Sequence, residues 1–178
     1  MIILALDVAT RTGFAIGEAG KIPRSDTARL KKPGEDVQVA WRNIGFLLRD
    51  MFVLDKPDLI VVEAPMHPTA QKSPDAVVLQ WGAVSVVTFI GAAYEIPIEW
   101  VNAQTVSKHF VGQSRFSAQQ GGRDAKKKAT IQRAQLLGYI PKDCRDDDRA
   151  DACAVFDYAS ARWGRVRPSN LVMFGERA

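Results

Sequence analysis

The chain has 178 residues, of which 47% are hydrophobic and 25% are charged, with a formal net charge of +4. A chain of this length suits one domain with a substantial core, because domains typically hold about 150 residues. The composition excludes a disordered, collagen-like or disulfide-scaffold protein, and the sequence contains no internal repeat.

The two cysteines, Cys144 and Cys153, are too few for a structural zinc site, which takes about four ligands. We therefore expect reduced thiols in a cytoplasmic protein. The nearest approach to a membrane span is the uncharged segment 76–94, whose flanks are Asp75 and Glu95 rather than Lys or Arg. We expect this segment to form a buried helix, and we expect no membrane association.

The first half of the chain alternates apolar runs with turn residues. Residues 2–6 predict a buried strand that ends at Asp7, and residues 13–17 predict a second strand that returns antiparallel after a polar turn at 10–12. The remaining elements expected in this half are a short strand at 27–30, a helix at 35–52 and a strand at 59–62 that ends in Glu63.

The second half predicts mainly helices. The elements expected in chain order are a loop at 66–74, a helix at 76–94, a strand at 96–101, a helix from an Asn102 cap to about 111, a polar loop at 112–122, a helix capped by Asp124 and running to 137, and a last helix at 148–163 capped by Asp146 or Asp147. Antiparallel strands followed by alternating helices and strands predict an α/β fold, a mixed sheet flanked by helices. We expect a single domain at residues 1–163 and a C-terminal tail at 164–178.

Carboxylates recur where the predicted core elements end or begin. Asp7 and Glu63 each end an apolar strand, while Asp148 and Asp151 are three residues apart and so share one face of the last helix. Four carboxylates brought together repel one another unless cations neutralise them, and hard oxygen ligands of this kind suit Mg²⁺ or Mn²⁺. Two such ions about 4 Å apart are the usual means of cleaving a phosphodiester bond.

Each acid alone also has a simpler interpretation as a turn former or a helix cap. The spacing leaves open whether Asp147 or Asp148 pairs with Asp151, because Asp147 precedes Asp151 by one helical turn. The recurrence of acids at three element ends favours a metal site over three unrelated caps.

A basic segment precedes the last acidic motif. Residues 108–128 contain six Lys or Arg and a single acid, Asp124, which is typical of a surface that faces phosphates. The six are Lys108, Arg115, Arg123, Lys126, Lys127 and Lys128.

Three segments resemble the acidic motifs of RuvC-type Holliday junction resolvases. They are Leu-Asp-Val-Ala-Thr-Arg-Thr-Gly-Phe-Ala-Ile at 6–16, Ile-Val-Val-Glu at 60–63 and Asp-Arg-Ala-Asp-Ala-Cys-Ala at 148–154. The resemblance covers about residues 1–163 and includes the basic segment. It implies an RNase H-like fold with a mixed five-stranded sheet, and it implies that Asp7, Glu63, Asp148 and Asp151 are the catalytic metal ligands, which selects Asp148 over Asp147.

The resemblance also suggests how DNA is held. Lys108 and one of Lys126 or Lys127 match phosphate-contacting lysines of the family, and we expect Arg123 to contribute to the same surface. Met66 stands where relatives often carry an aromatic residue that wedges against a base. The family acts as a homodimer that nicks two strands of a four-way junction symmetrically.

The resulting hypothesis is a Mg²⁺-dependent endonuclease with two ions per site, Mn²⁺ being able to substitute, that resolves four-way junctions in branched DNA. The alternatives are a nuclease of the same fold that acts on flaps, forks or RNA–DNA hybrids, and a catalytically silent junction-binding protein. The four intact acids argue against the silent protein, because binding alone does not require them. The motifs leave open whether the chain is a cellular or a phage-type member.

Overall fold

The structure is a computed structural model, and it describes residues 1–65, 67 and 73–164. Its strands are β1 (Ile2–Asp7), β2 (Arg11–Glu18), β3 (Arg24–Arg29), β4 (Leu59–Glu63) and β5 (Ile98–Val101). They form one five-stranded sheet in the order β3-β2-β1-β4-β5. The first three strands pair antiparallel, and β4 and β5 run parallel to β1. The expected mixed sheet is therefore confirmed.

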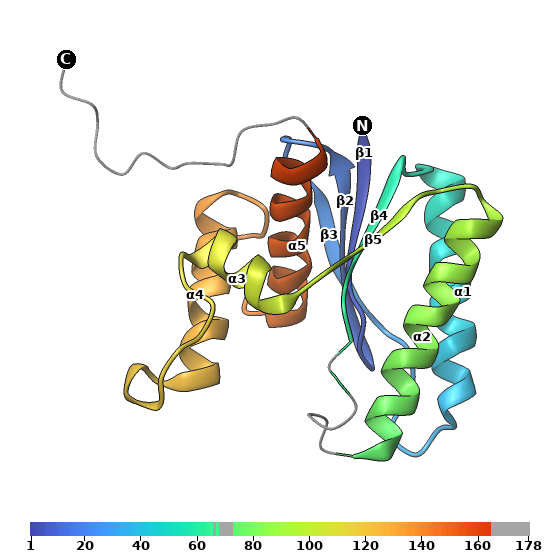
Figure 1. The fold of residues 1–178 in the computed structure, drawn as a ribbon, viewed down its shortest axis with the longest axis horizontal. Coiled ribbons are helices and arrows are strands. Elements are labelled where there is room, and N and C mark those ends of the chain that lie inside the picture. The colour runs from blue at the N-terminus through green and yellow to red at the C-terminus, as the bar shows by residue number, and fades with distance from the viewer. Residues whose placement is uncertain (66, 68–72, 165–178) are drawn as a thin grey trace.

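Helices cover both faces of this sheet (Figure 1). The helices on one face are α1 (Val37–Leu54) and α2 (Pro74–Ala93), and those on the other are α3 (Ala103–Val111), α4 (Gly122–Leu136) and α5 (Asp147–Trp163), with a short 3₁₀ helix, η2 (Ala118–Gln120), before α4. The molecule is thus a three-layer α/β structure.

Side chains of the central strands alternate between two cores. Ile3 and Ala5 of β1 belong to the core beneath α3, α4 and α5, whereas Leu4 and Leu6 belong to the core beneath α1 and α2. A strand that is buried on both faces requires a continuous apolar run rather than an alternating one. This explains why the runs at β1 and β4 were recognisable in the sequence.

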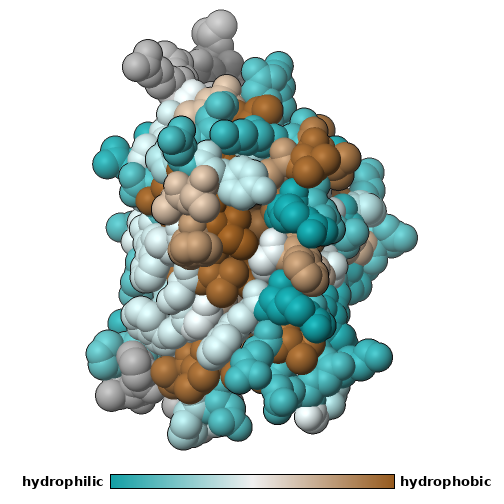
Figure 2. Space-filling view, turned by 90° about the vertical axis from the view of Figure 1, so that its right-hand side faces the viewer, coloured by the Kyte–Doolittle hydropathy of each residue, from teal (hydrophilic) through white to brown (hydrophobic). Residues whose placement is uncertain are grey.

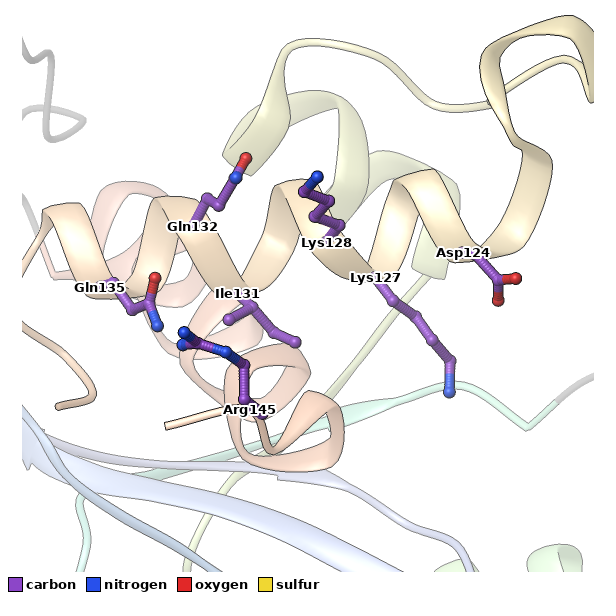
Figure 3. A pocket seen from close by; sticks show the side chains of 7 residues that line it. All are labelled: Asp124, Lys127, Lys128, Ile131, Gln132, Gln135 and Arg145. Carbon is purple, nitrogen blue, oxygen red and sulfur yellow. The ribbon is translucent and has the colours of Figure 1, made fainter. Parts of the chain in front are cut away.

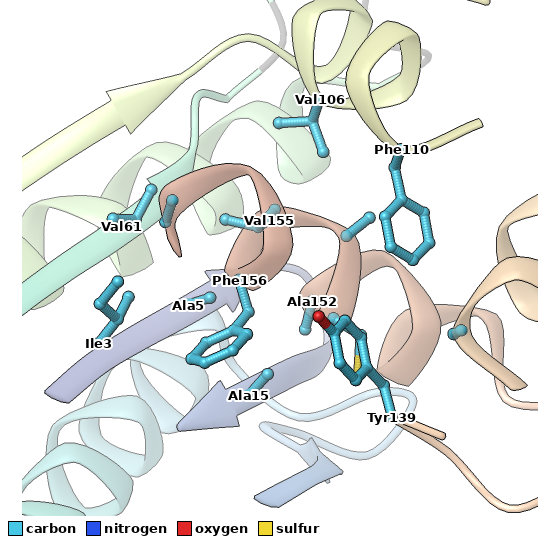
Figure 4. Packing of buried hydrophobic residues seen from close by; sticks show 14 of the residues in the cluster. Ile3, Ala5, Ala15, Val61, Val106, Phe110, Tyr139, Ala152, Val155 and Phe156 are labelled. Carbon is cyan, nitrogen blue, oxygen red and sulfur yellow. The ribbon is translucent and has the colours of Figure 1, made fainter. Parts of the chain in front are cut away.

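Small residues allow α5 to lie close to the sheet. Ala5 and Ala15 on the strands face Ala152 and the fully buried Phe156 of α5 (Figure 4). Because these alanines add little bulk, α5 contacts both β1 and β2 along its length. The position of α5 over these two strands decides where its acidic amino-terminal turn lies.

Most element boundaries differ from the sequence prediction by a few residues, and three of the differences have a clear physical reason. Strand β3 begins at Arg24, earlier than predicted, because a polar edge strand pairs through its backbone and lacks an apolar signature. Helix α2 begins at Pro74, the residue expected to break the chain, with Ser73 accepting a hydrogen bond from the Ala76 amide as its cap. The predicted Asp124 cap of α4 is wrong, since Gly121 in a left-handed conformation precedes the helix.

Helix α2 is buried on one face only, which corrects the expectation of a buried helix. Within the part of the chain that the structure describes, it is the one helix long and apolar enough to cross a membrane by length and composition. Its small residues serve contacts inside the protein, because Gly82 lies against the Trp41 ring and Gly91 against Ile98. The side chains on the opposite face, including Val78, Trp81 and Phe89, are exposed.

Candidate metal centre and nucleic-acid interface

Two of the predicted acids lie at one edge of the sheet. Strands β1 and β4 are parallel neighbours, so their carboxyl ends, with Asp7 and Glu63, meet at the same edge. Helix α5 brings Asp148 and Asp151 to this edge from the neighbouring layer. All four side chains are half-buried, so each is desolvated but still reachable from solvent.

The pKa values of the four acids show that they act on one another. Burial raises the pKa of Asp7 well above its ordinary value, and the charges of Glu63, Asp151 and Asp148 raise it further. Burial and the charge of Asp151 raise the pKa of Glu63 to about 7. Burial, with the charges of neighbouring aspartates, raises the pKa of Asp151 to about 6. The pKa of Asp148 is also raised, by burial and by Asp147 and Asp146.

Lys126 is the cation that opposes this repulsion at three of the four acids. Its charge lowers the pKa of Asp7, Glu63 and Asp151, which places its ammonium group near all three. Arg11 and Lys127 lower the pKa of Asp148, and Lys127 also lowers that of Asp151, yet all four acids retain raised pKa values. Four half-buried carboxylates with excess negative charge are the donor set that hard divalent cations require. The residues present therefore fit divalent metal ions.

Asp146, which precedes Asp148 by two residues, caps α5 and pairs with Arg11. Asp146 caps α5 by accepting a hydrogen bond from the Arg149 amide at 3.2 Å, and it also accepts one from the Thr27 hydroxyl at 3.0 Å. Arg11 forms an ion pair with Asp146, and its Nε lies 3.4 Å from Asp148 Oδ2. Arg11 therefore ties the first turn of α5 to the start of β2.

Asp147 forms an ion pair with Lys127, and its charge also raises the pKa of Asp148 and of Asp151. Partial burial raises the pKa of Asp147, but the hydrogen bond and charge of Lys127 outweigh it and the pKa is lowered overall. The three successive aspartates Asp146, Asp147 and Asp148 also bring one oxygen each within 4.8 Å of one another. Asp147 is held by Lys127 and Asp146 caps α5, whereas the charge of Asp148 raises the pKa of both Asp7 and Asp151, so we take Asp148 as the member of the three that joins the candidate metal site.

Gly13 determines how closely α5 approaches β1. It lies opposite Asp7 in the β1–β2 pairing. A Cβ at this position would lie 1.9 Å from the Asp148 carbonyl oxygen and 3.2 Å from the Ala152 Cβ. Only glycine allows the backbone of Asp148 to rest on β2 beside Asp7.

The structure separates the predicted DNA-binding residues into two groups. Lys126 faces the acids and Lys127 pairs with Asp147, as described above. Lys108 on α3 and Arg123 on α4 are exposed, and within the described part of the chain neither forms an ion pair with the four acids. Met66, the predicted wedge, lies outside the described residues.

Sequence reasoning gave no role to Arg11, Gly13 or the residues that anchor α3. His109 Nε2 lies 2.9 Å from Asp157 Oδ2, and the Tyr139 hydroxyl donates to Asp157 Oδ1 at 2.7 Å. This buried network fixes α3, and with it Lys108, against α5. The anchoring residues lie far apart in sequence, so no local pattern indicated them, and the same holds for the contacts that Arg11 and Gly13 make with α5.

No protein-family model matches the chain, and a comparison with characterised protein sequences finds no match. Solved structures do match. Thermus thermophilus RuvC, 15% identical, aligns over 92% of this chain and 97% of its own with a TM-score of 0.67.

Two further structures agree. T. thermophilus RuvC in complex with a Holliday junction substrate, 13% identical, aligns over 92% of this chain and 97% of its own with a TM-score of 0.68. The yeast mitochondrial Holliday junction resolvase, 13% identical, aligns over 86% of this chain and 75% of its own with a TM-score of 0.56. This chain therefore has the RNase H-like fold of the RuvC type.

Proposed function

We propose that this protein is a divalent-metal-dependent endonuclease that cuts branched DNA, with the four-way junction as its preferred substrate. The observation that carries the proposal is the group of four carboxylates, Asp7, Glu63, Asp148 and Asp151, whose pKa values are raised by burial and by one another. A protein gains no stability from four acids that repel one another, so their retention points to cations that bind there.

The four acids would hold two Mg²⁺ ions, with Mn²⁺ able to substitute, because both prefer carboxylate oxygen ligands. When bound, such ions lower the pKa of an attacking water and stabilise the departing 3′-oxygen of a phosphodiester. Because three other acids raise the pKa of Asp7, Asp7 lies among all of them and would contribute to holding both ions.

The basic residues would hold the DNA backbone. Lys126 lies at the acids and is placed to contact the phosphate that is cut, whereas Lys108 and Arg123 are exposed and free to reach flanking phosphates. Lys127 extends the same surface beside Asp147. Contacts of this kind position DNA without reading its sequence, so we expect structure to govern recognition more than base sequence. Met66 is proposed to wedge against a base at the junction.

The choice of a four-way junction is supported by the fold neighbours, one of which is bound to a Holliday junction substrate. Two symmetric nicks on such a junction require two sites related by a two-fold axis. We therefore propose a cytoplasmic homodimer, formed through the apolar face of α1 and α2. Figure 2 shows this face, on which brown apolar areas lie between polar ones. Its exposed large apolar residues are Phe46, Val53, Leu54, Val78, Trp81 and Phe89.

The test is a Mg²⁺ titration on four matched substrates: a four-way junction, a flap, a linear duplex and an RNA–DNA hybrid. We expect cleavage that requires the metal and that is fastest, with paired nicks, on the four-way junction. Equal or faster cleavage of flaps or hybrids would favour the alternative nuclease of the same fold. Tight junction binding without cleavage at any Mg²⁺ or Mn²⁺ concentration would favour the silent binding protein.

A further inference from the structure

A groove of about 440 Å³ runs along α4, beside the acid cluster but not formed by it (Figure 3). Its walls are the stretch of α4 from Asp124 to Gln135 and Arg145 from the loop before α5. The charged part of the lining consists of Lys127, Lys128 and Arg145 against the single carboxylate of Asp124. The groove is therefore a cationic surface.

The helix itself connects this groove to the proposed metal centre. Successive residues of an α-helix turn by about 100°, so three consecutive lysines point in three directions. Lys126 acts on the catalytic acids, Lys127 pairs with Asp147, and Lys128 lines the groove. In Figure 3 the side chains of Lys127 and Arg145 extend to one side of the α4 axis and that of Lys128 to the other. Lys127, which lines the groove and pairs with Asp147 next to Asp148, joins the groove to the proposed metal centre.

Two of the cations in the groove are available to a ligand. Within the part of the chain that the structure describes, no carboxylate forms an ion pair with Lys128 or Arg145. Arg145 Nη1 donates to the carbonyl oxygens of Lys142 and Cys144, at 3.1 Å each, which fixes the position of the guanidinium group. A guanidinium has five N–H donors, so this anchoring leaves others for a phosphate.

The lining also indicates which part of a nucleic acid fits. It contains no aromatic side chain, and its one apolar residue is Ile131. Unpaired bases bind by stacking on aromatic rings, whereas a duplex presents only its backbone to such a surface. The stretch of helix from Asp124 to Gln135 spans about 16 Å at 1.5 Å per residue, which matches several phosphates of one strand at 3.4 Å per nucleotide along B-DNA.

We propose that this groove, through Lys128 and Arg145, binds the phosphate backbone of the duplex arm that flanks the cut strand. The inference rests on the proposed nuclease function and extends it, because it adds a backbone contact to those proposed for Lys108 and Arg123. The contact would orient the arm so that the strand enters the acid cluster through Lys126.

The experiment measures junction binding in Ca²⁺ or EDTA, without cleavage, as a function of salt concentration. Each lost phosphate contact should lower the slope of log affinity against log salt by about one, so the Lys128→Gln, Arg145→Gln double variant should lower it by about two. Phosphate-ethylation interference should show positions on the arm that flanks the cut where ethylation weakens binding by the wild type but not by the double variant. Removing these nucleotides from the arm should reduce the difference in junction affinity between the double variant and the wild type.

Three controls keep the test specific. Lys56→Gln removes an exposed lysine just before β4, at the opposite end of that strand from Glu63, and should leave the slope unchanged. Arg145→Lys keeps the charge and should retain the slope, and Lys128→Gln alone avoids any effect on the loop that Arg145 anchors. An unchanged slope in the double variant, with normal junction binding, overturns the inference but leaves the nuclease proposal standing. Failure of the wild type to bind junctions overturns the proposed function instead.

Discussion

At the scale of single residues, the acid cluster carries more negative charge than the nearby cations offset. Asp7 is influenced by three other carboxylates and opposed by Lys126, and its pKa stays well above the ordinary value. Without divalent ions, protons must supply the missing positive charge. Metal binding therefore competes with protonation, and the site should release protons when an ion binds.

This imbalance predicts how stability depends on pH in the metal-free protein. Burial and Asp151 raise the pKa of Glu63 from 4.5 to about 7, so between these values the folded state holds more protons than the unfolded state. The free energy of unfolding must then fall as pH rises through that window. We expect the Tm of the wild type in EDTA to fall relative to that of Glu63→Gln between about pH 5 and about pH 8. Parallel Tm curves for the two proteins would contradict the assigned repulsion.

The pairing of Asp147 with Lys127 predicts unequal roles for neighbouring aspartates. Asp148→Asn should lower cleavage by about 100-fold or more, because even outer partners of metal ligands are worth about 10–100-fold. Asp147→Asn should retain most activity, since its carboxylate is paired with Lys127 and is not among the acids that raise the pKa of Asp7. Cleavage rates at saturating Mg²⁺ give the comparison. If Asp148→Asn cleaved normally and Asp147→Asn did not cleave, the assignment of Asp148 as the metal ligand would be reversed.

Gly13 predicts a loss of activity without a loss of DNA binding. Gly13→Ala would place a Cβ 1.9 Å from the Asp148 carbonyl oxygen, so α5 must move away from β2. A displacement of about 1 Å at a catalytic group can cost about 100-fold in rate, and we expect a loss of that size with junction affinity preserved. Gly45→Ala is the matched control, because its nearest neighbour lies at 3.4 Å, an ordinary contact. Wild-type cleavage by a folded Gly13→Ala protein would show that the close approach is unimportant.

How much of the site the sequence could predict depends on how local each feature is. Asp7 and Glu63 were recognisable because each directly follows an apolar run, and parallel strands bring such ends together. The sequence did not indicate which of Lys126 and Lys127 faces the four acids, because that depends on how α4 is rotated against α5. The contact between Gly13 and Asp148 joins residues 135 positions apart, as the pairing of Arg11 with Asp146 also does, and no local pattern reports such contacts.

At the scale of elements, strands buried on both faces were the easiest to predict. The boundaries of β1 and β4 agree with the expectation to within one residue, because a strand buried on both faces needs an uninterrupted run of apolar residues. Strand β3 was misplaced because its sequence, Arg-Ser-Asp-Thr-Ala-Arg, has no apolar periodicity and it forms through pairing with β2. The start of α4 was misplaced because a glycine in the left-handed conformation, with a φ of 91° at Gly121, replaced a side-chain cap.

Helix α2 leads to a prediction about assembly. Val78, Trp81 and Phe89 recur near multiples of the helical period and are all exposed, Phe89 by 73%. We expect a dimer in solution that Phe89→Glu converts to a monomer, because a carboxylate at an apolar interface would be buried without a partner. Light scattering at micromolar concentration measures the mass. Ile22→Glu, at an equally exposed apolar residue in the β2–β3 turn, should remain dimeric. A monomeric wild type would contradict the paired-nick mechanism.

At the scale of the whole molecule, the sheet divides two surfaces with different properties. Its α1–α2 side exposes apolar residues, and its α3–α5 side carries the lysines of α4 and the acidic turn of α5 (Figure 1). The proposed metal centre lies at the carboxyl ends of β1 and β4, beside the first turn of α5. This separation implies that substitutions on the α2 face should alter assembly while leaving metal binding intact.

The most direct test of the account compares wild type with Asp7→Asn on a four-way junction in Mg²⁺. Because Asp7 is the acid that the other three influence, its neutralisation should abolish cleavage. Removing a negative charge beside the phosphate should also leave junction binding as tight as in the wild type or tighter. Residual cleavage by Asp7→Asn above a few per cent of the wild-type rate, or wild-type cleavage that persists in EDTA, would contradict a metal centre built on these four acids.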